Sequence, residues 1–158
     1  VGEIFLSAWQ ARAAEARDWP DETDNDRLSR AFATLNRNGI VAREDFTCCQ
    51  RCAGDEIFEE FPPDSEPSGF VFFHQQDTRA AAAGGGLLLG FGGFRPRADA
   101  SPGEHRVTHA PADDASHVAV AERTVAALRD EGLSVRWNGT QQQRIRVSLT
   151  WQRRITPY

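Results

Sequence analysis

Three prolines, Pro62, Pro63 and Pro67, divide the chain into two stretches of different character, and this break most constrains the fold. Proline lacks a backbone donor and interrupts both helices and central strands. Before the break apolar residues recur at helical spacing, whereas after it most apolar runs are rich in strand-forming residues. We therefore expect an internal seam at residues 62–68, between a helical portion (1–61) and a sheet portion (68–158).

The helical portion contains two amphipathic patterns and part of a third. Apolar residues at 3–18 and at 28–35 each fall on one helix face, and an acidic segment at 21–26 suits the positive end of the second helix. Asn38-Gly39 can end that helix with a left-handed residue. We expect a third helix to begin around the cysteine-rich segment and residues 55–61.

The sheet portion predicts four strands and one helix. A buried strand is expected at 70–74, and the other elements follow in the order strand, helix, strand, strand: 87–91, 117–131, 133–137 and 145–151. A long loop is expected at 95–116, and Asn138-Gly139 is a hairpin signal.

These elements predict an α+β fold. In it, a helical N-terminal third packs on a small, mainly antiparallel four-stranded sheet (β-β-α-β-β) that ends in a hairpin. The length of 158 residues fits a single domain, residues 1–158.

Composition excludes several classes of protein. The net charge of -5 does not favour nucleic acid as a partner, because phosphate binding needs a basic surface. No apolar run approaches the roughly 20 residues that span a bilayer, and the first residues show no secretion signal. We therefore expect a cytoplasmic protein without a membrane segment.

Basic and sulfur-containing residues indicate the source of the chain. All eighteen basic residues are Arg, and there is no Lys or Met, as expected of a GC-rich bacterial genome such as that of an actinobacterium. Because the sequence begins with Val1, we expect further residues, a tag or a longer chain before it.

Three cysteines within five residues form the strongest chemical feature. Cys49 and Cys52 have the spacing that presents two sulfurs to one zinc ion or to each other, and Cys48 adds a third. A structural zinc site needs four ligands, so His74, or one of the histidines at 105, 109 and 117, would have to complete it. The alternatives are a redox site assisted by Arg51 and small buried core residues.

A polar run follows the most apolar predicted strand. His74 and Asp77 could act as a base and its orienting carboxylate or as metal ligands, with Gln75 and Gln76 beside them. The same residues could instead end the strand and cap the next helix. The glycine runs at 84–86 and 90–93 match no phosphate-binding loop and favour tight turns.

The final segment is basic and aromatic. Residues 134–158 contain five Arg and no acidic residue, interleaved with Trp137, Trp151 and Tyr158. Arg136, Arg144 and Arg146 therefore form a candidate anion-binding face. The outward polar face of a hairpin would give the same pattern.

Three segments carry a resemblance to a known family. They are Asp45-Phe-Thr-Cys-Cys-Gln-Arg-Cys52, Gly69-Phe-Val-Phe-Phe-His-Gln-Gln-Asp-Thr78 and Gly85-Gly-Leu-Leu-Leu-Gly-Phe-Gly92. In these segments the chain resembles an uncharacterised actinobacterial family of unknown function. The resemblance covers most of the chain and implies an intracellular bacterial origin, but it brings no activity, cofactor or partner.

The sequence thus predicts a small intracellular bacterial domain in which Cys48, Cys49, Cys52 and His74 form a thiolate or metal-binding site, with zinc as the candidate cofactor and otherwise none. One alternative is a non-enzymatic protein-interaction module that uses the acidic helices or the Arg-bearing hairpin. Another is a thiol oxidoreductase. The partner, a protein or a small molecule, is not defined by the residues, and neither is enzymatic activity.

Overall fold

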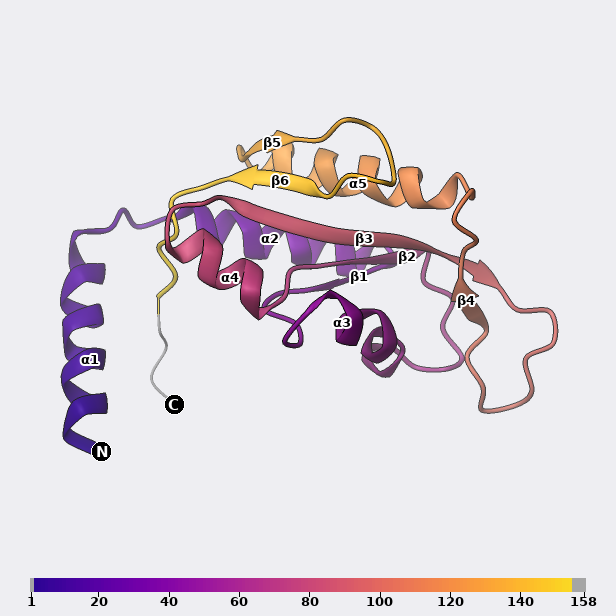
Figure 1. The fold of residues 1–158 in the computed structure, drawn as a ribbon, viewed down its shortest axis with the longest axis horizontal. Helices are drawn as coiled ribbons and strands as arrows, with labels where there is room; N and C mark the ends of the chain where they lie inside the picture. Colours follow the sequence, from indigo (N-terminus) through magenta and orange to yellow (C-terminus); the bar gives the residue numbers. More distant parts are fainter. Residues whose placement is uncertain (1, 155–158) are drawn as a thin grey trace.

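The computed structural model describes residues 2–154, which form five α-helices, two 3₁₀ turns and six strands (Figure 1). The elements are α1 (Gly2–Glu15), η1 (Ala16–Asp18), α2 (Asp24–Arg37), β1 (Ile40–Arg43), α3 (Gln50–Glu56), η2 (Ile57–Glu60), β2 (Gly69–Phe72), α4 (Gln75–Ala82), β3 (Leu87–Pro96), β4 (Val107–His109), α5 (Ser116–Asp130), β5 (Ser134–Arg136) and β6 (Ile145–Ser148). Tyr158, part of the predicted basic and aromatic segment, lies outside the described residues.

The strands form one sheet in the order β1-β2-β3-β6-β5, and β4 pairs with the far end of β3. Only β1 and β2 are parallel, so the predicted α+β class and the mainly antiparallel sheet are confirmed. The expected number of four strands was too low. The two additional strands, β1 and β4, have four and three residues, too few to show a regular alternation in the sequence.

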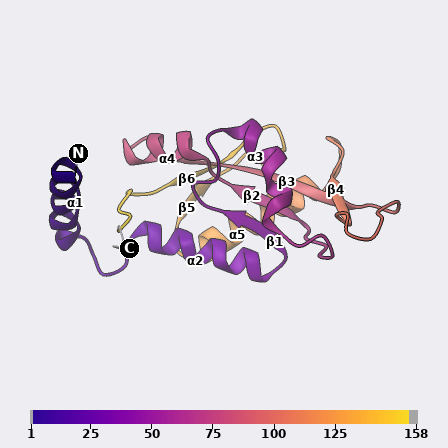
Figure 2. The ribbon, with the colours of Figure 1, turned by 90° about the horizontal axis from the view of Figure 1, so that it is seen from below.

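The two faces of the sheet carry different side chains. Helices α2 and α5 cover one face, and α3 lies on the other (Figure 2). The face under α2 and α5 is mainly aliphatic, with Leu28, Leu89 and Leu128 fully buried. The face under α3 is mainly aromatic and is built on Phe70 and Phe72 of β2.

The first helix departs from the expected packing of the whole helical third on the sheet. Helix α1 has no buried residue, and it stands apart from the sheet (Figure 1). Ile4 and Phe5 are 76% and 79% exposed. The apolar pattern correctly predicted a helix but could not show whether another element covers it. None of the described helices is long and apolar enough to cross a membrane.

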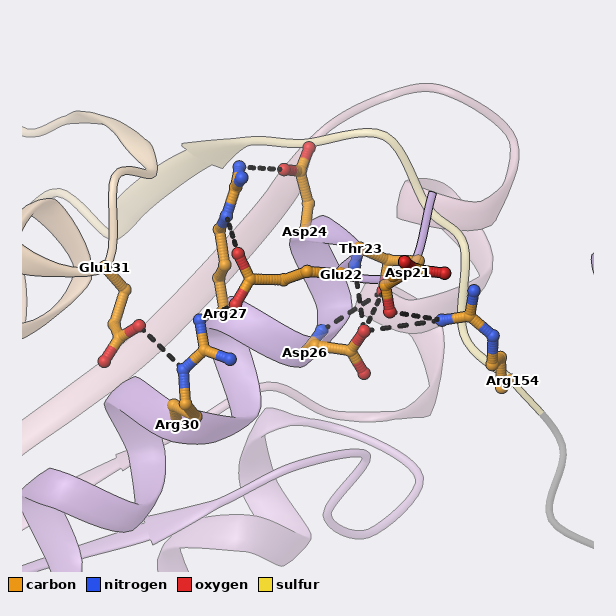
Figure 3. A network of polar contacts seen from close by, with 9 residues as sticks. All are labelled: Asp21, Glu22, Thr23, Asp24, Asp26, Arg27, Arg30, Glu131 and Arg154. Atoms are coloured by element: carbon orange, nitrogen blue, oxygen red, sulfur yellow. Dashed lines mark hydrogen bonds and ion pairs between the residues drawn. The ribbon is translucent and has the colours of Figure 1, made fainter. Parts of the chain in front are cut away.

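Helix α2 begins in a network of charged residues (Figure 3). Thr23 caps the helix: its hydroxyl accepts from the Asp26 backbone N–H at 3.3 Å, and the Asp26 carboxylate accepts from the Thr23 N–H at 2.8 Å. The Thr23 backbone N–H, and then the Thr23 hydroxyl, donate to the Asp26 carboxylate and lower its pKa. Arg30 pairs with Glu131 at 2.9 Å, which ties α2 to the end of α5. The acidic segment therefore anchors the helix that covers the aliphatic face.

The last strand is shorter than the predicted 145–151. It ends at Ser148 because the following backbone turns to α2, where the Thr150 N–H donates to Asp24 at 2.9 Å. Strands β5 and β6 are antiparallel neighbours, as a hairpin requires, but residues 137–144 connect them instead of a two-residue turn at Asn138-Gly139. The predicted loop at 95–116 contains β4.

Candidate metal centre

The three cysteines lie where a loop enters α3, on the aromatic side of the sheet. This loop is held by the end of β2 and the start of α4: the Phe46 N–H donates to the Phe73 carbonyl at 2.8 Å, and the Gln75 N–H donates to the Thr47 carbonyl at 3.1 Å. Asp45 and Thr47 both have positive φ, 51° and 58°. Because non-glycine residues rarely adopt this conformation, the surrounding contacts must hold the loop in its shape.

The sulfur atoms form a nearly equilateral triangle. The distances are 3.8 Å between Cys48 and Cys49, 3.6 Å between Cys48 and Cys52, and 3.7 Å between Cys49 and Cys52. A tetrahedral zinc ion with Zn–S bonds of about 2.3 Å has sulfur–sulfur edges of about 3.8 Å. A disulfide would need about 2.05 Å, and all three cysteines are free thiols. The triangle therefore matches three corners of a zinc tetrahedron.

The positions of the cysteines in the sequence explain this triangle. Cys49 is the residue that precedes the first turn of α3, and Cys52 lies in that turn, so a helix start brings their sulfurs together. The extended backbone of Cys49, with φ -158° and ψ 169°, leads into the turn from Cys48. Cys48 is exposed, and the other two are half-buried, so an ion can reach the sulfurs from solvent.

The protons of the three thiols are not equivalent. The backbone N–H of Cys52, followed by its thiol, lowers the pKa of Cys49. The thiol of Cys52 has its pKa raised to about 11 by hydrogen bonding to Cys48 and then to Cys49. The hydrogen bonds within the group therefore favour one thiolate and disfavour a second one beside it. A bound cation would remove this conflict by pairing with all three sulfurs.

His74, the expected fourth ligand, lies at the end of β2 and caps α4. The His74 ring Nδ1 accepts from the Asp77 backbone N–H at 3.3 Å, and the His74 backbone N–H donates to the Asp77 carboxylate at 3.0 Å. Burial, which leaves His74 5% exposed, lowers its pKa, and the nearby Arg144 cation acts in the same direction. Among the described residues, the group of three or more metal-ligand atoms within 4.8 Å of one another consists of the three sulfurs and does not include His74.

The other polar residues at this strand end divide into buried and exposed groups. Asp77 is buried and forms a two-point ion pair with Arg144, at 3.0 and 2.7 Å. Gln75 and Gln76 are exposed on the first turn of α4. The sequence assigned Arg144 only to an anion-binding face. In the structure, Arg144 also contacts the carboxylate of Asp77, which caps α4 together with His74. A separation of 67 residues hid this pair from sequence reasoning.

The remaining histidines also lie outside the sulfur group. His117 is buried, where its Nδ1 accepts from the Gly93 N–H at 2.9 Å and its Nε2 lies 2.8 Å from the Pro111 carbonyl. His109 has its Nε2 3.1 Å from the Gly54 carbonyl in α3. The His105 ring packs on Phe61, with centroids 4.8 Å apart. The rings of His117 and His109 thus contact backbone groups, and the ring of His105 packs against an aromatic side chain.

The third predicted group, Arg136, Arg144 and Arg146, lies together on the other edge of the sheet. All three line one hollow beside β6. Arg136 of β5 and Arg146 of β6 are paired directly across the two strands. The three arginines therefore share one surface, which is separate from the sulfur triangle.

Comparison with known proteins shows that the chain matches a family to which no activity is assigned. The model of a family described as Domain of unknown function (DUF6891) matches residues 1–155. No curated protein and no solved structure matches the chain.

Proposed function

Since the chain belongs to the DUF6891 family, whose description assigns no activity, we propose its function from the site itself: the protein binds a zinc ion through Cys48, Cys49 and Cys52. The single observation that supports this most strongly is the sulfur triangle, with edges of 3.6 to 3.8 Å. Thiolates are soft ligands that select zinc and similar ions over magnesium or calcium.

The fourth position of this zinc ion is open to an exchangeable ligand. Three protein ligands with an open position are the arrangement of catalytic zinc sites, whereas structural sites are closed by four protein ligands. The exposed Cys48 leaves the outer side of the triangle accessible to water, to a thiol or to a substrate atom. The site therefore supports ligand exchange at the metal.

Because three thiols stay reduced only in a reducing compartment, we also place the protein in the cytoplasm.

The direct test is native mass spectrometry of the freshly purified, tag-free protein beside a denatured control. The expected result is a mass increase of one zinc ion per chain, lost on denaturation or on addition of a strong chelator. Cobalt added to the apoprotein provides a second measurement, because thiolate coordination produces strong near-ultraviolet charge-transfer absorption. Each of Cys48→Ser, Cys49→Ser and Cys52→Ser should lose the bound ion.

His74→Asn is the matched control. Asparagine is a good helix cap, so this variant removes the imidazole and keeps an acceptor for α4. We expect it to retain zinc with unchanged affinity. Loss of zinc in His74→Asn, in a folded protein, would instead support the prediction that His74 supplies the fourth ligand.

A protein that has three free thiols and does not retain added zinc or cobalt would overturn the proposal. The cysteines would then be packing residues or redox groups, which thiol labelling distinguishes. A redox cysteine is labelled rapidly below pH 8, whereas an unperturbed cysteine titrates at about 8.5. Unchanged partner binding in a folded Cys49→Ser variant would favour the protein-interaction module that the sequence left open.

A further inference from the structure

A hollow of about 660 Å³ lies at the β5–β6 edge of the sheet and is independent of the sulfur triangle. Its volume is within the range of small-molecule sites. Its lining has three guanidinium groups and three amides but no carboxylate; these are the side chains of Arg136, Arg144, Arg146, Asn138, Gln142 and Gln143. A concave surface whose charged groups are all cationic, with neutral amides beside them and no carboxylate, is suited to an anion.

Two of the arginines are placed at an energetic cost. Arg136 and Arg146 occupy directly opposed positions of the antiparallel β5–β6 pair. Like charges in such cross-strand positions destabilise a sheet. Within residues 2–154 the Arg136 guanidinium makes no ion pair or hydrogen bond, and the Arg146 guanidinium donates only to the Gly85 carbonyl, at 3.1 Å. No acidic group among residues 2–154 therefore pairs with these two positive charges.

Two glycines beside β6, Gly85 and Gly86, leave space for the Arg146 side chain. Gly86 has a φ of +78°, and a Cβ at this position would approach the Arg146 Nη1 to 3.3 Å. The bond to Gly85 and the absence of a side chain at Gly86 hold one guanidinium beside the hollow. Such preorganisation reduces the entropy lost when an anion binds.

Arg144 has a different role in the same lining. Its charge is neutralised by the buried carboxylate of Asp77, and it also donates to the Leu88 carbonyl at 3.2 Å. It is therefore a fixed wall of the hollow. The uncompensated charge comes from Arg136 and Arg146 and amounts to two units.

We propose that this hollow binds a small phosphomonoester. A phosphate ester carries a charge close to -2 at neutral pH, which matches the two unpaired guanidinium groups. The remaining volume accommodates an organic group, with Leu88 and Trp137 as apolar contacts and the amides as hydrogen-bonding partners. A polyanion such as nucleic acid fits less well, because the chain as a whole carries a net charge of -5.

Isothermal titration calorimetry at low ionic strength tests this site, with ribose 5-phosphate as the probe and ribose as the uncharged control. We expect the native protein to bind ribose 5-phosphate and not ribose. Arg136→Gln and Arg146→Gln should each weaken the binding at least tenfold. Arg79→Gln is the matched control, because it removes one exposed positive charge of α4 outside the lining and should leave affinity unchanged.

Two results would overturn the proposal. One is the absence of ribose 5-phosphate binding at millimolar concentration in folded native protein. The other is an equal loss of affinity in Arg79→Gln and in the two lining variants, which would show only general charge attraction. Circular dichroism of each variant verifies folding. Because no cysteine is involved, the outcome is independent of zinc binding.

Discussion

The two faces of the sheet differ in how completely their side chains are buried. The face under α2 and α5 is a continuous aliphatic core in which Leu28, Leu89 and Leu128 are completely buried. On the opposite side the aromatic cluster is only partly closed: Phe58 and Phe61 pack against it and remain half-exposed. The cysteine loop enters on this side, next to the partly closed cluster. Incomplete burial leaves groups accessible, so sites form where the core is thinner.

The largest expected effect is on the aliphatic face. Leu128→Ala should reduce the free energy of unfolding by about 2 to 5 kcal/mol, since it removes a buried side chain and leaves a cavity. In metal-free protein Cys49→Ser should change it by less than about 0.5 kcal/mol, because the thiol is half-buried at the surface. Urea unfolding measures both. Equal effects of the two substitutions would contradict the division between the faces.

A smaller effect is expected at the buried ion pair between Asp77 of α4 and Arg144, next to β6. Arg144→Ala leaves the carboxylate of Asp77 buried without its cation and should cost about 2 to 3 kcal/mol. Arg146→Ala should cost less than about 0.5 kcal/mol, because its guanidinium is exposed. In a double-mutant cycle, Asp77→Ala should recover part of the loss in Arg144→Ala. Additive losses would show that the pair does not stabilise the fold.

The helix caps extend the comparison, because α2 uses Thr23 and α4 uses His74. Thr23→Ala should lower the free energy of unfolding by about 1 kcal/mol, through loss of the bond to the Asp26 N–H. This loss should be the same at pH 7.5 and pH 5.5, since a hydroxyl does not titrate there. Thermal unfolding at the two pH values provides the measurement, and Thr140→Ala on the exposed 137–144 connection is the control.

The smallest expected effect is a pH dependence of the His74 cap. Its pKa is lowered in the folded protein, so the unfolded chain binds the proton more readily. Its contribution is complete above the unfolded-state pKa of about 6.5 and is lost as the pH falls through the folded value. Protonation also removes the acceptor for the Asp77 N–H. We expect the free energy of unfolding to decrease by less than about 1 kcal/mol between pH 7 and pH 5.5, and to decrease less in His74→Asn. An equal decrease in that variant would show that other groups cause the pH dependence.

Much of the fold could be predicted because its signals are local. The helix expected at 117–131 is observed as Ser116–Asp130, and the acidic segment does lead into α2. The strands expected at 70–74 and 87–91 correspond to β2 and to the first part of β3. The helices form through contacts between residues a few positions apart, and each strand is a short run of apolar strand-forming residues, so both kinds of signal are visible in the sequence.

The unexpected features depend on distant segments. The exposure of α1 and the end of β6 at Ser148 depend on what lies beside them in space, as the bond from Thr150 to Asp24 shows. The sequence left two alternatives for His74, a base or metal ligand and a helix cap, and the structure shows the cap. The apolar strand before His74 and the polar residues after it are compatible with both. Histidine is not among the preferred capping residues, which weakened the signal.

By itself, the sequence determined the class of the fold and the three metal-ligand candidates, because helical periodicity and the spacing of Cys48, Cys49 and Cys52 act within one or two turns of chain. Only the tertiary structure decided which side chains meet across the sheet. It paired β1 with β2, joined Asp77 to Arg144 and brought Arg136 opposite Arg146. These contacts arise from strand register and the closure of long loops, which depend on the whole packed chain and leave no local pattern.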